Sequence, residues 1–431
     1  MGGRRRPTKI LISNIVTLNP GDAAILQGMF HILRQKYGED SEIIVFDRLA
    51  DAAAKYYPWA SFRQSFFGNR TEGRLASKLK ALGYGHWNTR LRYWWLRTCV
   101  TFMHLGLAAI PKLLLNREDF SSLRDYLGAD VILSSGGTYL IENYNLWPAI
   151  YDYRLTLATK RPLAFFTQSL GPFRQSNYRS AFADVFNRSH RVCVRDEKSR
   201  RHVTELGVSD EKVVVAKDAA FVLEPKERPK SFEEGPLPDK GLKVAVSVRS
   251  LHLFDKSGAD LETNYINSVI AMVEQAVRQF GAQVTFLSTC QGIEEYWTND
   301  ADFAQQILEL LPSDIRPNVA LDGAFRQPQE VVDTYGEFDL IIATRMHAAI
   351  LGLVAGTPVL GIAYEFKLEE LFHQLGMDNA RLSTQTMNPE RSREMVSSIL
   401  ANLEDWRAKV SEVRQQCRTQ AGSVKDKLPN V

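Results

Sequence analysis

The sequence has few cysteines, little net charge and no long hydrophobic run. Its 431 residues include four cysteines, which form no C-x-x-C pair and have no His at a metal-binding spacing. This pattern argues against a zinc site and a disulfide framework, and it favours a reducing compartment. The formal net charge of +3 gives no reason to expect nucleic acid as a partner. The apolar run at 10–18 contains polar residues and lacks a signal-peptide cleavage site, so we expect a cytoplasmic protein.

What the sequence does contain is a regular alternation of short β-like runs with helical stretches. Strands are predicted over residues 9–15, 42–47, 130–134, 163–167, 191–195, 213–216, 243–249, 283–288, 339–343 and 358–363. Such alternation is typical of α/β proteins in which helices cover both faces of a mostly parallel sheet. The Pro-, Gly- and charge-rich stretch at 225–242 interrupts the pattern and indicates a linker.

The linker divides the chain into two domains, which its length also predicts. We expect two doubly wound, Rossmann-like α/β domains that face a cleft, over residues 1–224 and 243–380, and a helical C-terminal tail over 381–431. Ligands of such sheets bind beyond the carboxyl ends of the strands. Residues that directly follow strands are therefore the candidates for a site.

Residues 51–125 do not fit the alternation and predict a helical insertion in the first domain. The segment is rich in Arg and aromatic residues, and its apolar stretch at 99–115 is too short to span a bilayer. One interpretation is a buried helical subdomain. The other is a helix that lies at a membrane interface, because Trp94, Trp95 and arginines flank the apolar stretch.

The second half contains the strongest candidate site. Arg345 and His347 lie where a predicted strand turns into a helix, and the N–H groups and dipole of a helix N-terminus favour anions. A guanidinium suits carboxylate or phosphate, and an imidazole can hold phosphate or transfer a proton. The alternative is that both residues only cap the strand end. Tyr364 and Lys367 follow the next strand, and Lys367 is either a phosphate ligand or proton donor, or an ordinary solvated lysine.

Candidates in the first half are weaker. Gly136 and Gly137 follow a strand and let a substrate approach the backbone, although a plain tight turn needs the same glycines. Asp22 is placed to cap the helix after the first strand. Gln168 and Arg195 each follow a predicted strand. Arg195 either binds an anion or forms an interdomain salt bridge.

Taken in order, these segments resemble the polysaccharide pyruvyltransferase family. The pattern of that family includes an N-x-G-D turn, a strand followed by Gly-Gly, a Gln before Gly-Pro, an Arg-Asp-x-x-Ser segment, Arg-x-His and a Tyr/Lys segment. In this chain the corresponding residues are 19–22, 136–137, 168–172, 195–199, 345–347 and 364–367. The resemblance leaves out the insertion, the linker and the tail.

The resemblance implies a GT-B-like fold with the donor site in the second domain and the acceptor site in the first. It implies transfer of pyruvate from phosphoenolpyruvate onto a hydroxyl pair of a sugar, in a polysaccharide or lipid-linked glycan, without a metal or other cofactor. Arg195, Arg345 and His347 would bind the phosphate and carboxylate, with the backbone of Met346 assisting. Either His347 or Lys367 would be the acid. The other candidates for substrate binding are Arg249, Tyr364, Gly136, Gly137, Gln168 and Asp22.

Two other functions stay open at this point. Arg, His and a helix N-terminus would equally hold a diphosphate, so a GT-B glycosyltransferase that uses a nucleotide sugar is one alternative. A non-catalytic protein that binds a glycan or an anion is the other. If the insertion lies at a membrane interface, the protein is peripheral at the inner face of the membrane.

Overall fold

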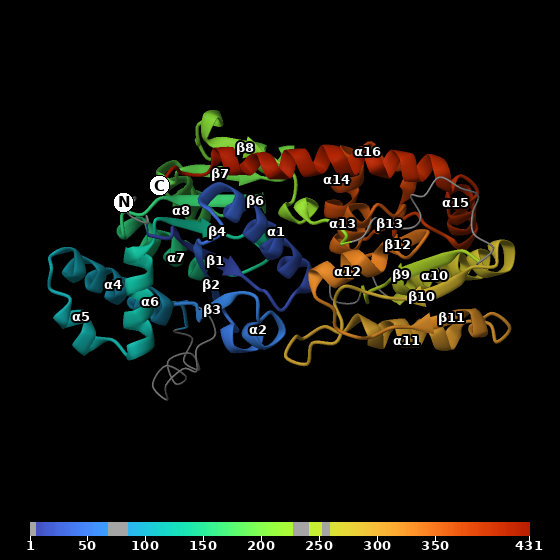
Figure 1. The fold of residues 1–431 in the computed structure, drawn as a ribbon, viewed down its shortest axis with the longest axis horizontal. Helices are drawn as coiled ribbons and strands as arrows, with labels where there is room; N and C mark the ends of the chain where they lie inside the picture. Colours follow the sequence, from blue (N-terminus) through green and yellow to red (C-terminus); the bar gives the residue numbers. More distant parts are fainter. Residues whose placement is uncertain (1–5, 68–84, 227–240, 252–258) are drawn as a thin grey trace, which may run out of the picture. The chain divides into compact units, whose positions relative to one another are not determined.

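The computed structural model describes residues 6–67, 85–226, 241–251 and 259–431. Its contacts divide the chain into two compact units, each with its own sheet (Figure 1). The first unit contains the chain up to Leu18, together with Ile25–Ala219 and Gln420–Val431, and the second contains Asn19–Ala24 and Ala220–Thr419. Most of the predicted linker, residues 227–240, lies outside the described residues.

The first unit is built on an eight-stranded sheet in which neighbouring strands pair in parallel. The order is β3-β2-β1-β4-β6-β7-β8, and β5 pairs with β6. The strands are β1 (Lys9–Ile15), β2 (Glu42–Asp47), β3 (Ser61–Gln64), β4 (Val131–Ser134), β5 (Gly137–Leu140), β6 (Leu163–Leu170), β7 (Arg191–Val194) and β8 (Val213–Val215). β4 and β6 are buried along their whole length, which explains why their sequences are nearly continuous apolar runs.

The helices of the first unit connect these strands. They are α1 (Pro20–Tyr37, whose first residues group with the second unit), α2 (Ala50–Tyr56), α4 (Gly85–His104), α5 (Ala109–Leu114), α6 (Arg117–Gly128), α7 (Trp147–Ala158), α8 (Ser176–Arg188) and α9 (Glu197–Thr204). α1 begins earlier than Asp22, which corrects the predicted cap. The side chain of Asn19 accepts a hydrogen bond from the Gly21 backbone N–H, and Pro20 occupies the first helical position.

The second unit has a six-stranded parallel sheet with the order β11-β10-β9-β12-β13-β14. Its strands are β9 (Lys243–Ser247), β10 (Gln283–Phe286), β11 (Val319–Leu321), β12 (Leu340–Ala343), β13 (Val359–Ala363) and β14 (Arg381–Ser383). Its helices are α10 (Ala259–Phe280), α11 (Asp300–Leu310), α12 (Pro328–Tyr335), α13 (Met346–Ala355), α14 (Phe366–Gln374), α15 (Pro389–Ala401) and most of α16 (Leu403–Gly422).

Two predicted segments differ from what was expected. The segment 51–125 is not only helical, because β3 pairs with β2 and extends the first sheet. β3 is a half-exposed edge strand without an apolar run, so periodicity did not reveal it. The predicted tail 381–431 begins with β14, a three-residue strand that pairs with β13, and its last residues, 420–431, group with the first unit.

The strand order of each sheet reverses once. In the first unit the reversal lies between β1 and β4, and in the second it lies between β9 and β12. Such a switch point leaves a crevice at the carboxyl ends of the two strands, because the connecting helices diverge to opposite faces of the sheet. Within the described ranges, the search for a helix with the length and apolar character to cross a bilayer found none.

Candidate active site

The register of the second sheet brings two arginines to its switch point. Ser247 of β9 pairs with Ala343 of β12, and Arg249 and Arg345 each lie two residues beyond this pair. The parallel register therefore places both arginines at the carboxyl edge of the sheet. β13 is the next neighbour of β12, and it brings Tyr364 to the same edge.

Arg345 is held by a buried carboxylate that sequence patterns did not reveal. Nε and Nη2 of Arg345 donate to Oδ2 and Oδ1 of Asp300, each over 2.6 Å. Asp300 is the first residue of α11, and only 1% of its surface is exposed. Burial acts to lower the pKa of Arg345, but the charge and hydrogen bonds of Asp300 raise it above its usual range. No described residue accepts a hydrogen bond from the third nitrogen, Nη1, so that side of the guanidinium is available to a ligand.

Arg249 is a second buried cation beside Arg345. Its Nη1 donates to the hydroxyl of Tyr364, and its Cζ lies 4.9 Å from the centre of the Tyr364 ring. Burial lowers the pKa of Arg249, and the positive charge of Arg345 lowers it further. A bound anion would offset both effects, because it would replace the lost solvation and screen the repulsion between the two cations.

The N-terminus of α13 lies at the same edge. Arg345 is the residue before its first turn, and Met346 and His347 are its first two residues. The first backbone N–H groups of a helix have no acceptor within the helix, and the dipole adds partial positive charge there. Met346 therefore offers a backbone donor beside the two guanidinium groups.

His347 packs against the turn that opens α1. A Cβ placed on Gly21 would lie 2.2 Å from Nδ1 of His347, so only glycine leaves room for the imidazole ring. The neighbouring Asp22 is buried. Burial raises the pKa of the Cys290 thiol to about 12, and the negative charge of Asp22 acts in the same direction. The N-x-G-D and Arg-x-His segments, far apart in the sequence, thus meet within the second unit.

Lys367 follows Tyr364 into the first turn of α14. Its ammonium nitrogen lies 3.2 Å from a carboxylate oxygen of Glu365, and both side chains are about a quarter exposed, at 24% and 28%. Lys367 is thus paired with a neighbouring carboxylate, which the prediction of a phosphate ligand or proton donor did not include.

The first unit gathers the other candidates around β4, β5 and β6. A Cβ on Gly136 would lie 2.8 Å from Cγ2 of Ile25, and Gly137 has a φ of +120°, so packing and backbone conformation both require glycine here. Gln168 lies inside β6 rather than after it, which corrects the prediction. Its side chain donates to the hydroxyl of Ser134 over 2.9 Å and so ties β6 to β4.

Arg195 is surrounded by partners of its own unit. Nε donates to the hydroxyl of Ser169 and Nη1 to Asp218, each over 2.7 Å, and Nη2 donates to the hydroxyl of Thr138. The salt bridge with Asp218 lies within the first unit, so the predicted alternative of an interdomain pair is wrong. All three nitrogens of this guanidinium are engaged.

The residues after Arg195 explain the rest of its motif. Asp196 caps α9 by accepting a hydrogen bond from the Ser199 backbone N–H over 2.6 Å. The hydroxyl of Ser199 accepts in turn from the Leu170 backbone N–H over 2.9 Å, at the end of β6. The Arg-Asp-x-x-Ser segment therefore joins α9 to the carboxyl ends of β6 and β7.

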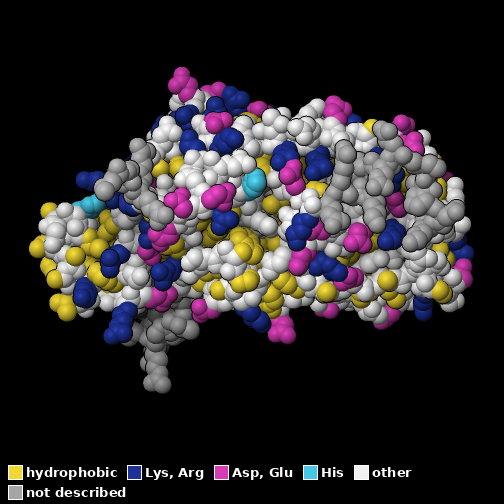
Figure 2. Space-filling model, viewed as in Figure 1, with side chains coloured by type: hydrophobic (Ala, Val, Ile, Leu, Met, Phe, Trp, Pro, Cys, Tyr) yellow, Lys and Arg dark blue, Asp and Glu magenta, His cyan; other side chains and the backbone are white. Residues whose placement is uncertain are grey.

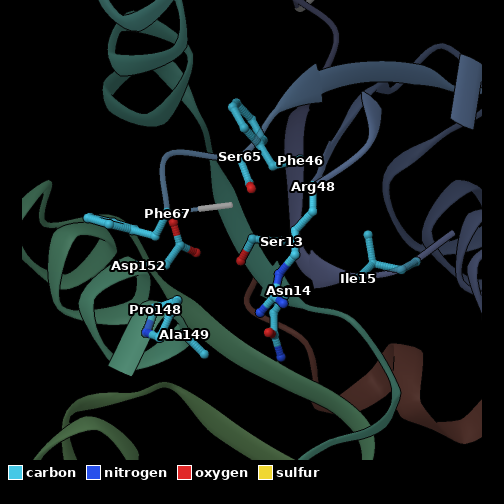
Figure 3. Close-up of a pocket in the computed structure, with 10 residues that line it drawn as sticks. All are labelled: Ser13, Asn14, Ile15, Phe46, Arg48, Ser65, Phe67, Pro148, Ala149 and Asp152. Atoms are coloured by element: carbon cyan, nitrogen blue, oxygen red, sulfur yellow. The ribbon is translucent and has the colours of Figure 1, made fainter. Parts of the chain in front are cut away.

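A small pocket of about 30 Å³ lies at the carboxyl ends of β1 and β2 (Figure 3). Two of its buried polar atoms, Nδ2 of Asn14 and Oγ of Ser65, have no hydrogen-bond partner among the described residues. Figure 3 shows the carboxyl of Asp152 and the hydroxyl of Ser13 pointing toward one another. Burial raises the pKa of Asp152 to about 6, although hydrogen bonds from Tyr126 and Ser13 act to lower it. The volume suits one hydroxyl group or one water molecule.

Sequence patterns did not reveal this pocket, because Asp152 lies in the middle of α7. No group of three or more His, Cys, Asp or Glu side chains that could hold a metal ion was found within the described ranges.

The fold defines the general class of the protein. The structure is similar to that of the Alr3699/HepE protein of Anabaena in complex with UDP-glucose, with a TM-score of 0.55, 12% identity and coverage of 97% of this chain and 100% of that one. A putative UDP-N-acetylglucosamine 2-epimerase from Listeria monocytogenes has a TM-score of 0.54 at 11% identity, covering 97% and 94% of the two chains. At these identities the likeness shows the fold alone. The predicted GT-B-like α/β fold is confirmed.

Sequence comparison defines the family within that class. A family model described as polysaccharide pyruvyl transferase matches residues 19–365, and the chain belongs to this family. The amylovoran biosynthesis protein AmsJ of Erwinia amylovora is 25% identical over 421 residues, which are 95% of this chain and 96% of AmsJ. The matched range contains Arg195, Arg345 and His347, and it ends before Lys367. The predicted family is confirmed.

Proposed function

We propose that the protein transfers pyruvate from phosphoenolpyruvate to a pair of sugar hydroxyls in a polysaccharide or lipid-linked glycan precursor. Family membership and the relative AmsJ support pyruvyl transfer to a polysaccharide. The observation that supports the donor is a pair of arginines beside the N-terminus of α13, the buried Arg249 and the partly buried Arg345.

Phosphoenolpyruvate carries a carboxylate and a phosphate on one carbon, and this edge of the sheet offers donors for both groups. Nη1 of Arg345, the guanidinium of Arg249 and the backbone N–H of Met346 would hold the two anions. Tyr364 would orient Arg249. We assign Arg195 a positioning role in the first unit, because its three nitrogens already have partners there.

The proposed reaction converts phosphoenolpyruvate and a sugar diol into a pyruvate ketal and inorganic phosphate. A general acid adds a proton to the methylene carbon, which becomes a methyl group and leaves the adjacent carbon electrophilic. The first hydroxyl oxygen attacks that carbon and loses its proton. The second hydroxyl oxygen then attacks the same carbon and loses its proton, while the bond to the phosphate oxygen breaks and phosphate leaves with the electron pair. General acid catalysis typically contributes about 10²–10⁴-fold.

Of the two acid candidates, His347 fits the role better. His347 is the second residue of α13, whose N-terminus would hold the donor, and its ring is packed against Gly21. A bound dianion would favour the imidazolium. Lys367 is instead paired with Glu365. If Lys367→Met abolished turnover and His347→Gln retained it, the assignment would be reversed.

On the acceptor side, we propose that the pocket of Figure 3 receives a sugar hydroxyl. Nδ2 of Asn14 and Oγ of Ser65, which have no partner among the described residues, would hydrogen-bond that group beside the carboxyl of Asp152. A carboxyl with a pKa of about 6 is mostly ionised at neutral pH, so Asp152 is suited to take the hydroxyl proton. Ser13 and Asn14 would orient the hydroxyl from the end of β1.

A donor assay tests the proposed function. The protein is incubated with an acceptor glycan library and either phosphoenolpyruvate or nucleotide sugars, and products are detected by mass spectrometry. We expect a pyruvyl increment with phosphoenolpyruvate only. A hexosyl increment would assign the protein to glycosyl transfer, and no increment with any donor would assign it to binding. The matched control is Arg345→Gln combined with Asp300→Asn, which removes the buried ion pair while keeping side chains of similar size.

We further propose that the reaction takes place in the cytoplasm, where phosphoenolpyruvate is made, with the protein peripheral at the inner face of the membrane. A lipid-linked acceptor would be available there.

A further inference from the structure

Helices α4 and α5 and the turn between them carry more than half of the exposed large hydrophobic side chains of the described chain. Seven of its thirteen exposed large hydrophobic side chains lie in this short segment: Leu91, Trp94, Trp95, Leu105, Leu107, Leu113 and Leu114. We call these seven residues the α4–α5 surface. Figure 2 shows hydrophobic side chains gathered at the left end of the view, where Figure 1 places α4 and α5. Exposed apolar side chains that cluster in this way usually mark an interaction site.

The α4–α5 surface is not part of the core. One face of α4 packs into the first unit through Tyr93, Leu96, Cys99 and Val100, which are all buried. The seven residues of the α4–α5 surface are exposed, and Leu113 is 86% exposed. The predicted alternative of a buried helical subdomain therefore does not describe the outward face of α4 and α5, which is exposed. Because the inner face anchors α4, the outer face is presented on a fixed support.

The charged side chains of the segment itself are basic, and the first acidic residues, Glu118 and Asp119, follow in α6. Residues 85–116 contain four basic residues and no Asp or Glu. Of the basic residues, Arg92 is bound by Asp119, whereas Arg97 and Lys112 are exposed. Cζ of Arg97 lies 5.1 Å from the centre of the Trp94 ring, a cation–π contact. Tryptophan and arginine beside exposed leucines are the residues that settle at the boundary between lipid headgroups and acyl chains.

We propose that the α4–α5 surface binds an anionic phospholipid membrane, with the leucines and tryptophans in the headgroup boundary and Arg97 and Lys112 on lipid phosphates. A second copy of this chain is a poorer occupant. A two-fold symmetric contact would bring the basic residues of both copies together, with no acidic residue in 85–116 to neutralise them. The α4–α5 surface shares no residue with the proposed reaction. A failed test of membrane binding can therefore be distinguished from a failed test of pyruvyl transfer.

Vesicle co-sedimentation of the full chain tests this inference. Vesicles of phosphatidylcholine are compared with and without phosphatidylglycerol, at low and at high salt. We expect binding to the anionic vesicles that weakens at high salt, since surface charges are screened over about 8–10 Å at physiological ionic strength. Leu105→Gln, Leu107→Gln and Leu113→Gln together should lower the partition coefficient by about tenfold or more. Arg97→Gln with Lys112→Gln should lower it by roughly fivefold per charge, on anionic vesicles only.

The matched control replaces equally exposed apolar residues of the second unit. Trp297 and Leu310 are 65% and 59% exposed, and changing both to Gln should leave vesicle binding at the wild-type level. Thermal melts confirm that each variant is folded. The inference is overturned if the wild type stays in the supernatant with anionic vesicles at low salt, or if the triple leucine variant binds like the wild type. It is also overturned if the wild type is a dimer that the leucine changes dissociate without any vesicle binding.

Discussion

The two units each place an arginine just after a parallel strand, and each pairs it with a buried aspartate of the same unit. Arg195 donates from all three of its nitrogens, to Ser169, Asp218 and Thr138. Arg345 donates from two nitrogens to Asp300, and no described residue accepts from the third. Arg345 also lies close enough to a second cation, Arg249, that its positive charge lowers the pKa of Arg249.

The number of engaged guanidinium nitrogens distinguishes a structural arginine from one that can bind a ligand. A guanidinium with every nitrogen engaged holds strands and a helix in place, and it would have to give up a partner to reach a ligand. A guanidinium that is held on one side by a carboxylate is oriented without being saturated, which suits recognition of a carboxylate or phosphate. Sequence position did not distinguish Arg195 from Arg345, because both follow a strand.

The largest expected effect comes from replacing both residues of the Arg345–Asp300 ion pair, and the matched change is made at the Arg195–Asp218 ion pair. Arg345→Gln with Asp300→Asn should lower turnover of phosphoenolpyruvate by about 10³-fold or more, because it removes a cation from the proposed donor site. Arg195→Gln with Asp218→Asn should leave the affinity for phosphoenolpyruvate near the wild-type value. Steady-state kinetics and isothermal titration measure both. Wild-type turnover in the first variant, or lost donor affinity in the second, would break the comparison.

Single replacements of the two aspartates test whether the two arginines differ in their availability to an anion. Asp300→Asn and Asp218→Asn each leave a buried arginine without its counter-charge, which typically destabilises by about 3–5 kcal/mol. Only the first should be rescued by an anion, because Arg345 is available to a ligand and Arg195 is surrounded. Thermal unfolding with added inorganic phosphate measures this rescue. Equal rescue of both variants would show that the two arginines are equally available.

The proposed acceptor pocket is tested by Asp152→Asn. Turnover should fall by about 10²-fold, the lower range for a general base, while phosphoenolpyruvate affinity is unchanged. In the wild type, turnover should decrease as the pH falls through about 6, because the Asp152 carboxyl then takes up a proton. That decrease should be missing in the variant. Asp184→Asn, at an exposed site on α8, is the control. An unchanged pH profile in Asp152→Asn would remove this residue from the reaction.

The smallest effect is expected at Gly21. Gly21→Ala should push the imidazole of His347 out of place and lower turnover by about tenfold to about 100-fold, since displacing a catalytic group by about 1 Å has an effect of this size. Gly128→Ala is the matched control, because no atom lies within 4 Å of its added Cβ. Full activity in Gly21→Ala would show that the position of this ring does not matter for the reaction.

Much of the fold and part of the site could be predicted from the sequence. The bounds of β1 and β2 agree with the prediction, since each is a strong local pattern bounded by polar or turn residues. Arg345 and His347 could be found because a strand that runs directly into a helix defines an anion-binding position. β3, β5, β11 and β14 were missed, because strands of three or four residues leave little periodicity to detect.

The sequence by itself determined most of the segments that form strands and helices, and many of the polar residues at their ends, because these features depend on neighbours a few positions away. Only the tertiary structure decided which distant residues meet. Asp300 with Arg345, Gly21 with His347 and Asp152 with Ser13 are contacts or approaches set by strand register and helix packing. It also decided that α4 turns one apolar face into the core and the other outward, because burial of a face depends on what packs against it.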